Sequence, residues 1–425
     1  MALGADQWLT AEDWPEPDGF ASQSPMKAMA PDQIEFQEYA TRWLAENPAP
    51  EPPERLPLSP LEVMTVGQRD YLQAWQRKVY EAGLIGCDYP KAYGGGGHQG
   101  FQRLANQAMA AAGGPFLINV VGLNMAAPTI LVHGTEAQKQ RFIPGCLSAD
   151  EIWCQGFSEP GAGSDMANQQ TLAVQEDGSG DWIVNGHKVW TSLGHFAQWM
   201  ILIARTSRDH KYDGLTYFLA PIEGAEGVTV RPLIKITGES GFNEVLFEDT
   251  RVSDDLRLDA VGKGWAVAMT TLTYERGAAE SAGGGGGGPS AVSRLIALAR
   301  ATERDGICAA DDALIRDAIV QRAIASEGLR QAGRLARIEA LNEHPMRIPL
   351  QQKVVSSEMA QENARLGVEI AGAHSTLYKL DSEAPDAGYW PLSYMNSYGH
   401  TIAAGTNEIQ RNILGERILG LPKSK

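Results

Sequence analysis

The stretch Ile152–Asp165 joins a short apolar run to a polar loop, and its residue types suit the binding of a polar ligand. The first half, Ile152–Ser158, is apolar with aromatic residues near both ends, which predicts a buried strand. Gly161 and Gly163 then favour a tight loop that ends at Ser164. Glycines let backbone N–H groups approach a ligand closely, and serine hydroxyls can join them. The alternative is an ordinary turn at the end of a strand.

Two glycine-rich segments lack the features of nucleotide-binding motifs. Gly161-x-Gly163 has Met166 where a dinucleotide fingerprint needs its third glycine, and we expect a hairpin rather than a crossover helix to follow. Gly283–Gly288 lacks the Gly-Lys-Ser/Thr end of a phosphate-binding loop. We interpret it as a flexible break between two helices, which would widen or loosen a substrate pocket beside it.

The segment after Ile152 resembles the middle-domain flavin signature of the acyl-CoA dehydrogenase family. Three further runs resemble family motifs and follow in the family's order: Asn185–Ser192, Phe242–Val245 and Ala403–Arg411. The resemblance covers most of the chain. It implies an α+β fold with an N-terminal α-helical domain, a small middle β domain and a C-terminal four-helix bundle.

Dehydrogenation of an acyl thioester needs a base for the α-proton and an acceptor for the β-hydride, which no side chain can be. The resemblance implies FAD as that acceptor, lying between the β domain and the bundle. The implied FAD contacts are Gln155, Phe157, Ser158, Gly163, Ser164, Trp190, Thr191, Ser192, Thr406 and Glu408. The implied substrate contacts are Ser164, Arg276, Ala404 and Gly405. For Trp190 the alternative is a plain core tryptophan.

The position of the base departs from the majority pattern of the family. Many members carry a glutamate directly before the Gly-Thr of the C-terminal motif, where this chain has Ala404. A branch with isovaleryl- and long-chain-type enzymes carries it in a Glu-Arg pair on an earlier helix, which matches Glu275-Arg276 here. We therefore assign Glu275 as the base, because an apolar pocket would raise its pKa toward the working pH. A solvated helix carboxylate is the alternative, and Glu280 is the reserve candidate.

Two other departures bear on the substrate and on the assembly. In the family the backbone N–H at the position of Ala404 helps to hold the thioester carbonyl; alanine keeps this N–H and leaves volume for a branched or bulky acyl group. Family members also carry an Arg-x-x-Phe-Gly stretch that reaches the flavin of a neighbouring subunit. The corresponding region after Arg300 has no Phe-Gly, which puts a plain homotetramer in doubt. We expect a homodimer, a homotetramer or a mixed tetramer.

Hydrophobic periodicity divides the chain into an arm and three domains: 1–30, 31–150, 151–262 and 263–425. Apolar residues at helical spacing, and breaks at Pro and Gly, predict N-terminal helices over Ile34–Ala45, Tyr71–Gly83, His98–Ala112, Pro115–Val132 and Glu136–Leu147. The middle part alternates with period two. It predicts a hairpin with an Asn185-Gly186 turn, then strands over Trp199–Arg205, Leu215–Pro221, Val228–Leu233 and Val245–Asp249. The predicted later helices are Met269–Ser281, Val292–Glu303, Asp311–Leu341, Leu350–Ala371 and Glu408–Leu419.

Composition excludes several classes of protein. The formal net charge of −16 argues against nucleic acid or an anionic membrane as the main partner, although a local basic pocket could still bind a CoA ester. The 4 cysteines form no C-x-x-C pair, so we expect free thiols in a reducing compartment and a cytoplasmic protein. Neither a metal-binding pattern nor an apolar run long enough to span a membrane is present in the sequence.

Three functions are compatible with these residues. The first is an FAD-dependent acyl-CoA dehydrogenase that passes electrons to an electron-transfer flavoprotein. The second is a non-catalytic or half-site subunit of a mixed complex, which Ala404 and the missing Phe-Gly favour. The third is a flavin oxidase or monooxygenase on the same scaffold, which would consume oxygen without an added acceptor.

Overall fold

The N-terminal part of the chain is helical. The computed structural model describes residues 30–281, 290–304, 306–335, 338, 347–379 and 381–423, and only the backbone of 276–281. The N-terminal helices are α1 (Pro31–Glu46), α2 (Val66–Glu81), α3 (Phe101–Ala112), α4 (Ala127–His133) and α5 (Glu136–Ser148). A π-helical turn, Gly122–Ala126, leads directly into α4. The expected arm over residues 1–30 lies almost wholly outside the described residues.

A mixed sheet follows, with β1 (Trp153–Gly156), β2 (Leu172–Gln175), β3 (Trp182–Ser192), β4 (Trp199–Arg205), β5 (Leu215–Pro221), β6 (Val228–Leu233), β7 (Phe242–Val252) and β8 (Arg257–Leu258). The strand order is β6-β7-β3-β2-β4-β5-β8, and β1 pairs with β4. β1 and β2 run parallel to β4, whereas the other neighbouring pairs are antiparallel.

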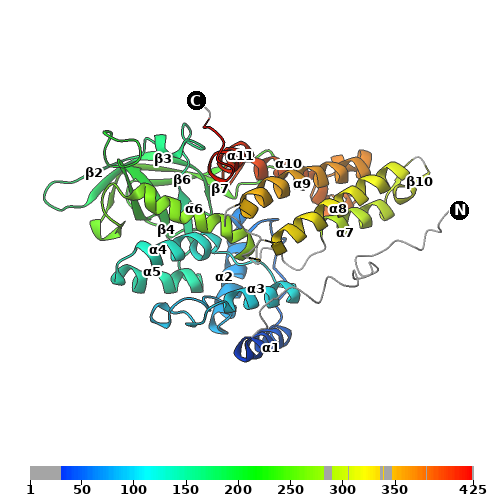
Figure 1. Ribbon diagram of the computed structural model, residues 1–425, viewed down its shortest axis with the longest axis horizontal. Helices are drawn as coiled ribbons and strands as arrows, with labels where there is room; N and C mark the ends of the chain where they lie inside the picture. Colours follow the sequence, from blue (N-terminus) through cyan, green and yellow to red (C-terminus); the bar gives the residue numbers. More distant parts are fainter. Residues whose placement is uncertain are drawn as a thin grey trace.

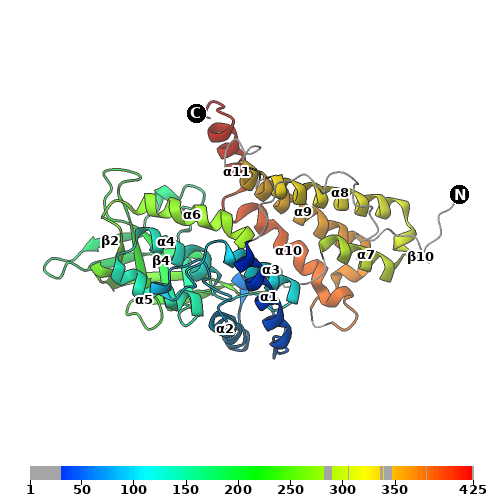
Figure 2. The same ribbon diagram turned by 60° about the horizontal axis from the view of Figure 1, so that its bottom comes forward.

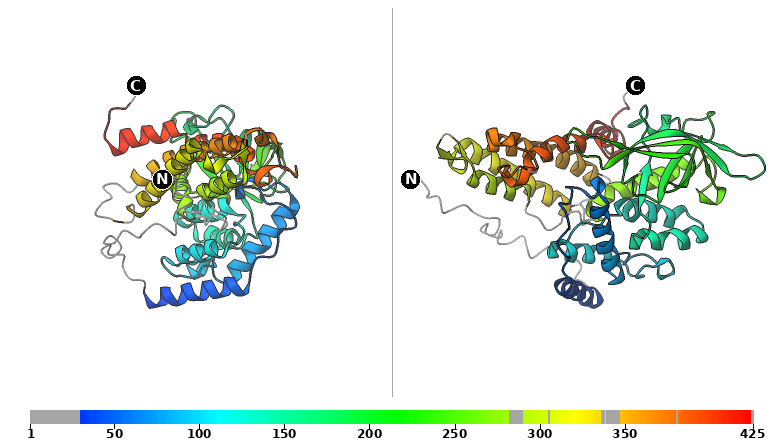
Figure 3. Two further views of the ribbon diagram at one scale, coloured as in Figure 1. Left: turned by 90° about the vertical axis from the view of Figure 1, so that its right-hand side faces the viewer. Right: turned by 180° about the vertical axis from the view of Figure 1, so that it is seen from behind.

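The last part of the chain is again helical. Its helices are α6 (Gly264–Ser281), α7 (Ala291–Ala301), α8 (Ala313–Leu335), α9 (Arg347–Ala371), α10 (Tyr389–Ile402) and α11 (Asn407–Ile413), with a two-stranded ribbon of β9 (Glu303–Arg304) and β10 (Ile307–Cys308). α7 to α10 form a bundle that extends away from the sheet (Figures 1 and 2), and α11 packs against α9. The view from behind in Figure 3 shows the same separation.

Helix α6 connects the helical and sheet parts. α6 packs against α4, against β5 and against the π-helical turn Gly122–Ala126 that precedes α4. A continuous apolar core lies between α4, α6 and one face of the sheet and includes Ile130, Trp153, Tyr217 and Val267, all buried. A separate core joins α7, α8, α9 and α10 around residues such as Trp390. The start of α6 lies so close to β5 that a Cβ on Gly264 would overlap the backbone of Thr216.

The predicted hairpin turn at Asn185-Gly186 is wrong, because β3 continues through both residues. The pairing of β3 with β7 shifts register between Val184 and Gly186, so the Asn-Gly pair lies at a bulge. The Asn185 side chain exchanges two hydrogen bonds of 2.9 Å with Asp249, which has a left-handed φ of 49°. A β-carbon at Gly186 would overlap Thr171, which explains the glycine without a turn.

The helix predicted over Pro115–Val132 begins only at Val120, because residues 113–119 form a loop and the next turn is π-helical. α10 was not predicted, because Pro391 and several tyrosines weaken its helical signal. The helix predicted over Asp311–Leu341 is described as α8 up to Leu335, and most of the remaining residues lie outside the described part of the chain, as does Gly283–Gly288.

Candidate functional site

The loop that follows β1 is held in place from beneath by a buried lysine on β3. The Lys188 ammonium donates hydrogen bonds to Glu159 Oε1 at 2.9 Å, to Gln169 Oε1 at 2.6 Å and to the carbonyl of Phe157 at 3.3 Å. Glu159 in turn accepts the backbone N–H groups of Gln170 and Thr171, at 2.6 and 2.9 Å. This network fixes both ends of the loop and leaves Gly163 and Ser164 exposed at its tip.

Burial acts differently on the two charges of this network. It lowers the pKa of Lys188 to about 8, against the attraction of Glu159. Burial alone would raise the pKa of Glu159, but the charge of Lys188 and the hydrogen bonds from Gln170, Thr171 and Lys188 together lower it. Both groups are therefore charged at neutral pH, and each depends on the other in the dry interior.

The end of β3 has unusual backbone geometry. Its pairing with β7 shifts register between Lys188 and Thr191, and Trp190 in this interval has a left-handed φ of 58°. That conformation is strained for an aromatic residue and needs support from its surroundings. Trp190 is 56% exposed, and Phe242 contacts its ring edge-on with the ring centroids 5.9 Å apart. Thr191 and Ser192 are buried.

Buried polar atoms without partners lie at the same place. Among the residues that the structure describes, Thr191 Oγ1 and Asn243 Oδ1 are buried and make no hydrogen bond. Asn243 also donates from Nδ2 to the Thr191 carbonyl at 3.1 Å, so the two residues are neighbours. Buried polar atoms normally find partners, so this end of β3 suits a polar ligand beside Trp190.

The predicted residues of β1 meet this strand end. The backbone N–H of Val189 donates to the Ser158 carbonyl at 2.9 Å, which brings the loop after β1 alongside the end of β3. Phe157 is buried and contacts Tyr217 edge-on at 5.9 Å, while Gln155 and Ser158 are half-buried.

The C-terminal motif forms a left-handed corner between α10 and α11. Ala404 and Gly405 have φ values of 53° and 80°. The corner is closed by Gln410, whose amide donates to the Ala404 carbonyl at 2.8 Å, and by Thr406, which caps α11 by accepting the N–H of Ile409 at 3.2 Å. Glu408 is exposed in the first turn of α11, where its own backbone N–H and the Thr406 hydroxyl lower its pKa.

Glu275 is half-buried on α6, one turn after the buried Thr271. The Thr271 hydroxyl lies 3.0 Å from the hydroxyls of Thr129 on α4 and Tyr217 on β5, and it donates to the Val267 carbonyl at 3.1 Å. These bonds fix the face of α6 that carries Glu275, because residues four apart share a helix face. The side chains of Arg276 and Glu280 lie outside the described residues.

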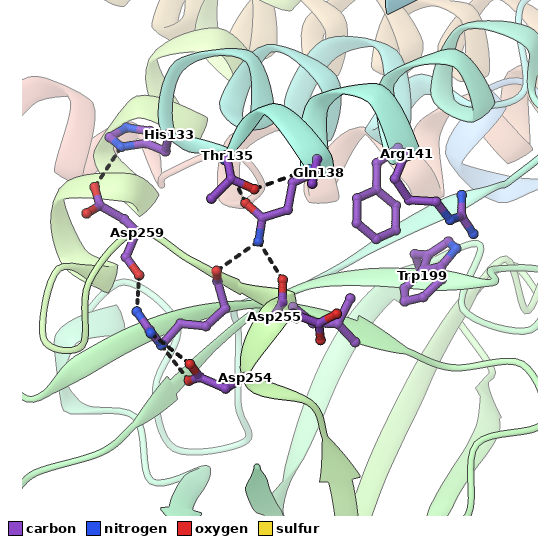
Figure 4. Close-up of a pocket in the computed structure, with 12 residues that line it drawn as sticks. His133, Thr135, Gln138, Arg141, Trp199, Asp254, Asp255 and Asp259 are labelled. Carbon is purple, nitrogen blue, oxygen red and sulfur yellow. Dashed lines mark hydrogen bonds and ion pairs between the residues drawn. The ribbon is translucent and has the colours of Figure 1, made fainter. Parts of the chain in front are cut away.

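A pocket of about 630 Å³ lies elsewhere, where α4 and α5 meet the segment around β8. Figure 4 shows His133 facing Asp259, at 3.0 Å, and Gln138 reaching the carbonyls of Asp255 and Arg257, at 2.8 and 3.0 Å. The polar groups of this pocket mostly bind one another, and none of the predicted site residues lines it. We interpret it as a junction that holds the N-terminal helices to the sheet.

Sequence reasoning missed the residues that support the site from behind. Lys188 lies within the matched run Asn185–Ser192, and the available signal was a lysine directly before Val189 and Trp190 in a predicted strand. Asn243 was also part of a matched motif, without a role. The described residues contain no cluster of His, Cys, Asp and Glu suited to a metal ion, and no described helix is long and apolar enough to cross a membrane.

Family models match nearly the whole chain. The acyl-CoA dehydrogenase N-terminal, middle and C-terminal domains match residues 30–150, 154–250 and 262–419. Acyl-CoA dehydrogenase IpdE1 from Mycobacterium tuberculosis is 38% identical over 398 residues, which is 92% of this chain and 98% of that protein. Acyl-CoA dehydrogenase FadE34 from the same organism is 36% identical and aligns over 81% of this chain but 45% of its own length.

Two solved structures are similar along almost their full length. The Tcur3481-Tcur3483 steroid ACAD has a TM-score of 0.76 at 24% identity, covering 93% of this chain and 99% of that chain. The ChsE4-ChsE5 complex from Mycobacterium tuberculosis has a TM-score of 0.72 at 26% identity, covering 94% and 100%.

Proposed function

The chain belongs to the acyl-CoA dehydrogenase family, and on that premise we propose that it is an FAD-dependent enzyme that oxidises the Cα–Cβ bond of an acyl-CoA thioester. Glu275 takes the α-proton as a carboxylate, and the β-hydride leaves the substrate in the same overall reaction. FAD, when bound, supplies the hydride acceptor at N5 of its isoalloxazine ring.

The observation that carries the proposal is the end of β3. A strained, exposed Trp190 lies beside the buried and unpartnered polar atoms of Thr191 and Asn243. Such groups fit a cofactor that offers both an aromatic ring and polar ring atoms, as FAD does. We propose that Trp190, Thr191 and Ser192 contact the flavin, together with Gln155, Phe157, Ser158, Gly163, Ser164, Thr406 and Glu408.

Other residues of the chain position the base and bind the substrate. The buried hydroxyl of Thr271 fixes the turn of α6 that presents Glu275. The backbone N–H of Ala404 donates to the thioester carbonyl, which makes the α-proton more acidic. Ser164, Arg276 and Gly405 complete our proposed substrate contacts. With a methyl group at position 404 instead of a longer side chain, there is room for a bulky or branched acyl group.

We propose partners on chemical and comparative grounds. The electron-accepting partner would be an electron-transfer flavoprotein, and the chain assembles as a homodimer, a homotetramer or a mixed tetramer. The similarity to the ChsE4-ChsE5 complex supports an assembly of two kinds of subunit. A cytoplasmic location accords with the four free thiols, three of them buried.

The test compares Glu275→Gln with the wild-type protein, both loaded with FAD. We expect the variant to keep its visible flavin spectrum and to lose anaerobic bleaching by acyl-CoAs about a hundredfold or more, because a general base contributes that much. Glu280→Gln is the matched control and should bleach at the wild-type rate. If Glu275→Gln bleaches normally and Glu280→Gln does not, the base is Glu280.

A half-site subunit is the second candidate, because Ala404 replaces the usual glutamate of the C-terminal motif. This function predicts that the purified chain binds FAD weakly and bleaches only after a second subunit is added. Oxygen consumption without an added acceptor would instead indicate an oxidase.

A further inference from the structure

The segment between β6 and β7, residues 234–241, contacts the N-terminal helical part, the end of β3 and the C-terminal bundle. Its Lys235 is only 11% exposed in its side chain, and the ammonium donates to Glu62 Oε1 at 2.7 Å and to Asn396 Oδ1 on α10 at 2.7 Å. The Thr237 carbonyl accepts the hydroxyl of Tyr378 at 2.8 Å. We name residues 234–241 the junction loop.

The charges around Lys235 balance within a small volume. Glu239 lies 3.4 Å from Lys235 and 3.2 Å from Lys379, so two carboxylates face two ammonium groups. Burial raises the pKa of Glu62 despite the opposing hydrogen bond from Lys235. Burial alone would raise the pKa of Glu239 as well, but Lys379 and Lys235 lower it. Lys235 is therefore the cation that makes a charged Glu62 tolerable in this interior.

The junction loop also touches the strand end proposed to contact the flavin. The Lys235 ammonium lies 5.7 Å from the centroid of the Phe242 ring, and Phe242 is the residue that contacts Trp190 edge-on. The Gly241 carbonyl accepts the N–H of Leu193 at 3.3 Å, directly after Ser192. A Cβ on Gly241 would overlap the Glu62 backbone, so the loop has no free space on that side.

On the opposite side, Lys235 reaches the element that carries the C-terminal motif. Asn396 lies on α10, which ends at Ile402 directly before Ala403-Ala404. One buried ammonium thus connects Phe242, and through it Trp190, with α10. The sheet and the bundle have separate cores, so their relative position depends on such connections.

We propose that Lys235 is a positioning residue that holds the Trp190 strand end and the Ala404 corner in the mutual position that FAD requires. This inference rests on the proposed function and adds to it a residue that contacts neither substrate nor reacting atoms. It acts through Phe242 on one side and through Asn396 on the other.

The test measures FAD affinity and the melting temperature of the apo-protein separately. We expect Lys235→Met to weaken FAD binding about tenfold or more, through loss of the charge-assisted bond to Asn396, and to lower the apo melting temperature. Lys139→Met is the control for loss of a lysine charge, because Lys139 on α5 pairs with one exposed carboxylate, Glu136, and no bond joins it to the junction loop among the described residues. It should bind FAD within about twofold of wild type.

The double variant Lys235→Met/Glu62→Gln separates positioning from charge balance. Removal of both charges should restore much of the apo melting temperature, because no unpaired Glu62 carboxylate remains. FAD affinity should stay low, because the bond to Asn396 is still absent. Recovery of FAD affinity together with the melting temperature would overturn the inference and leave Lys235 with a purely structural role.

Asn396→Ala keeps the inference testable if Lys235→Met does not fold. It removes the bond to α10 and leaves the ion pair with Glu62, so FAD binding should weaken about tenfold, as in Lys235→Met, while the apo melting temperature falls less than in Lys235→Met. Wild-type affinity in this variant contradicts the inference. If the wild-type chain itself binds no FAD, the proposed function fails first; if wild type and Lys235→Met bind it equally, only the inference fails.

Discussion

Replacement of Lys188 by methionine is the perturbation whose effect the structure defines most fully. Methionine fills a similar volume but leaves Glu159 buried with no cation, and Gln169 Oε1 and the Phe157 carbonyl lose their donor. Removal of one partner from a buried ion pair costs about 3–5 kcal/mol of unfolding free energy. We expect Lys188→Met to fall in that range and to loosen the loop that carries Ser158 and Ser164.

The assay is urea unfolding of three apo-proteins: wild type, Lys188→Met and Lys188→Met/Glu159→Gln. The double variant removes both charges, so it should recover at least about 1 kcal/mol relative to the single variant. Glu159→Gln keeps one acceptor oxygen and therefore one of the two bonds from the N–H groups of Gln170 and Thr171, so recovery is expected to be partial. A loss below about 1 kcal/mol in Lys188→Met, or no recovery in the double variant, would show that the pair does not hold this loop.

Two other predictions concern α6 and the same lysine. Thr271→Val should lower the unfolding free energy by about 1–3 kcal/mol in urea unfolding, because Thr129 and Tyr217 lose their shared partner. Thr273→Val is the control, because the Thr273 hydroxyl bonds the Met269 carbonyl of its own helix, and it should change the unfolding free energy by less than about 0.5 kcal/mol. For pH, the pKa of Lys188 falls from 10.5 to about 8 on folding, so the folded chain binds fewer protons than the unfolded chain between these values. The unfolding free energy of wild type relative to Lys188→Met should therefore rise with pH from about 8 to 10.5, and a falling difference would contradict this assignment.

The strands that sequence reasoning placed correctly are those whose signal is local. β4, β5 and β6 have the predicted bounds, because each is a short apolar or alternating run between turn residues. The Asn-Gly pair misled because a bulge in a long strand accepts the same residues as a two-residue turn. Only the pairing of β3 with β7, far along the chain, distinguishes the two.

The site follows the same division between local and distant information. The loop after β1 is a single run of sequence, and so is the motif at Ala404. A resemblance to family motifs could therefore suggest both. The supporting residues become neighbours only in the folded chain: Lys188 reaches back to Glu159, and Lys235 reaches Glu62 and Asn396. A lysine in a strand or loop is usually solvated, and nothing local to Lys235 indicates its burial.

The strand end at Trp190 has a consequence for handling the purified protein. Three exposed apolar side chains lie close to Phe242 in the sequence or in space. They are Trp190 and the two isoleucines that flank Lys235, Ile234 and Ile236, which are 74% and 82% exposed. Exposed apolar side chains favour contact with any other apolar surface, including a second copy in a concentrated sample. The apo-protein should therefore be titrated with FAD at low protein concentration. Light scattering should be recorded in parallel, so that aggregation is not mistaken for loss of FAD binding.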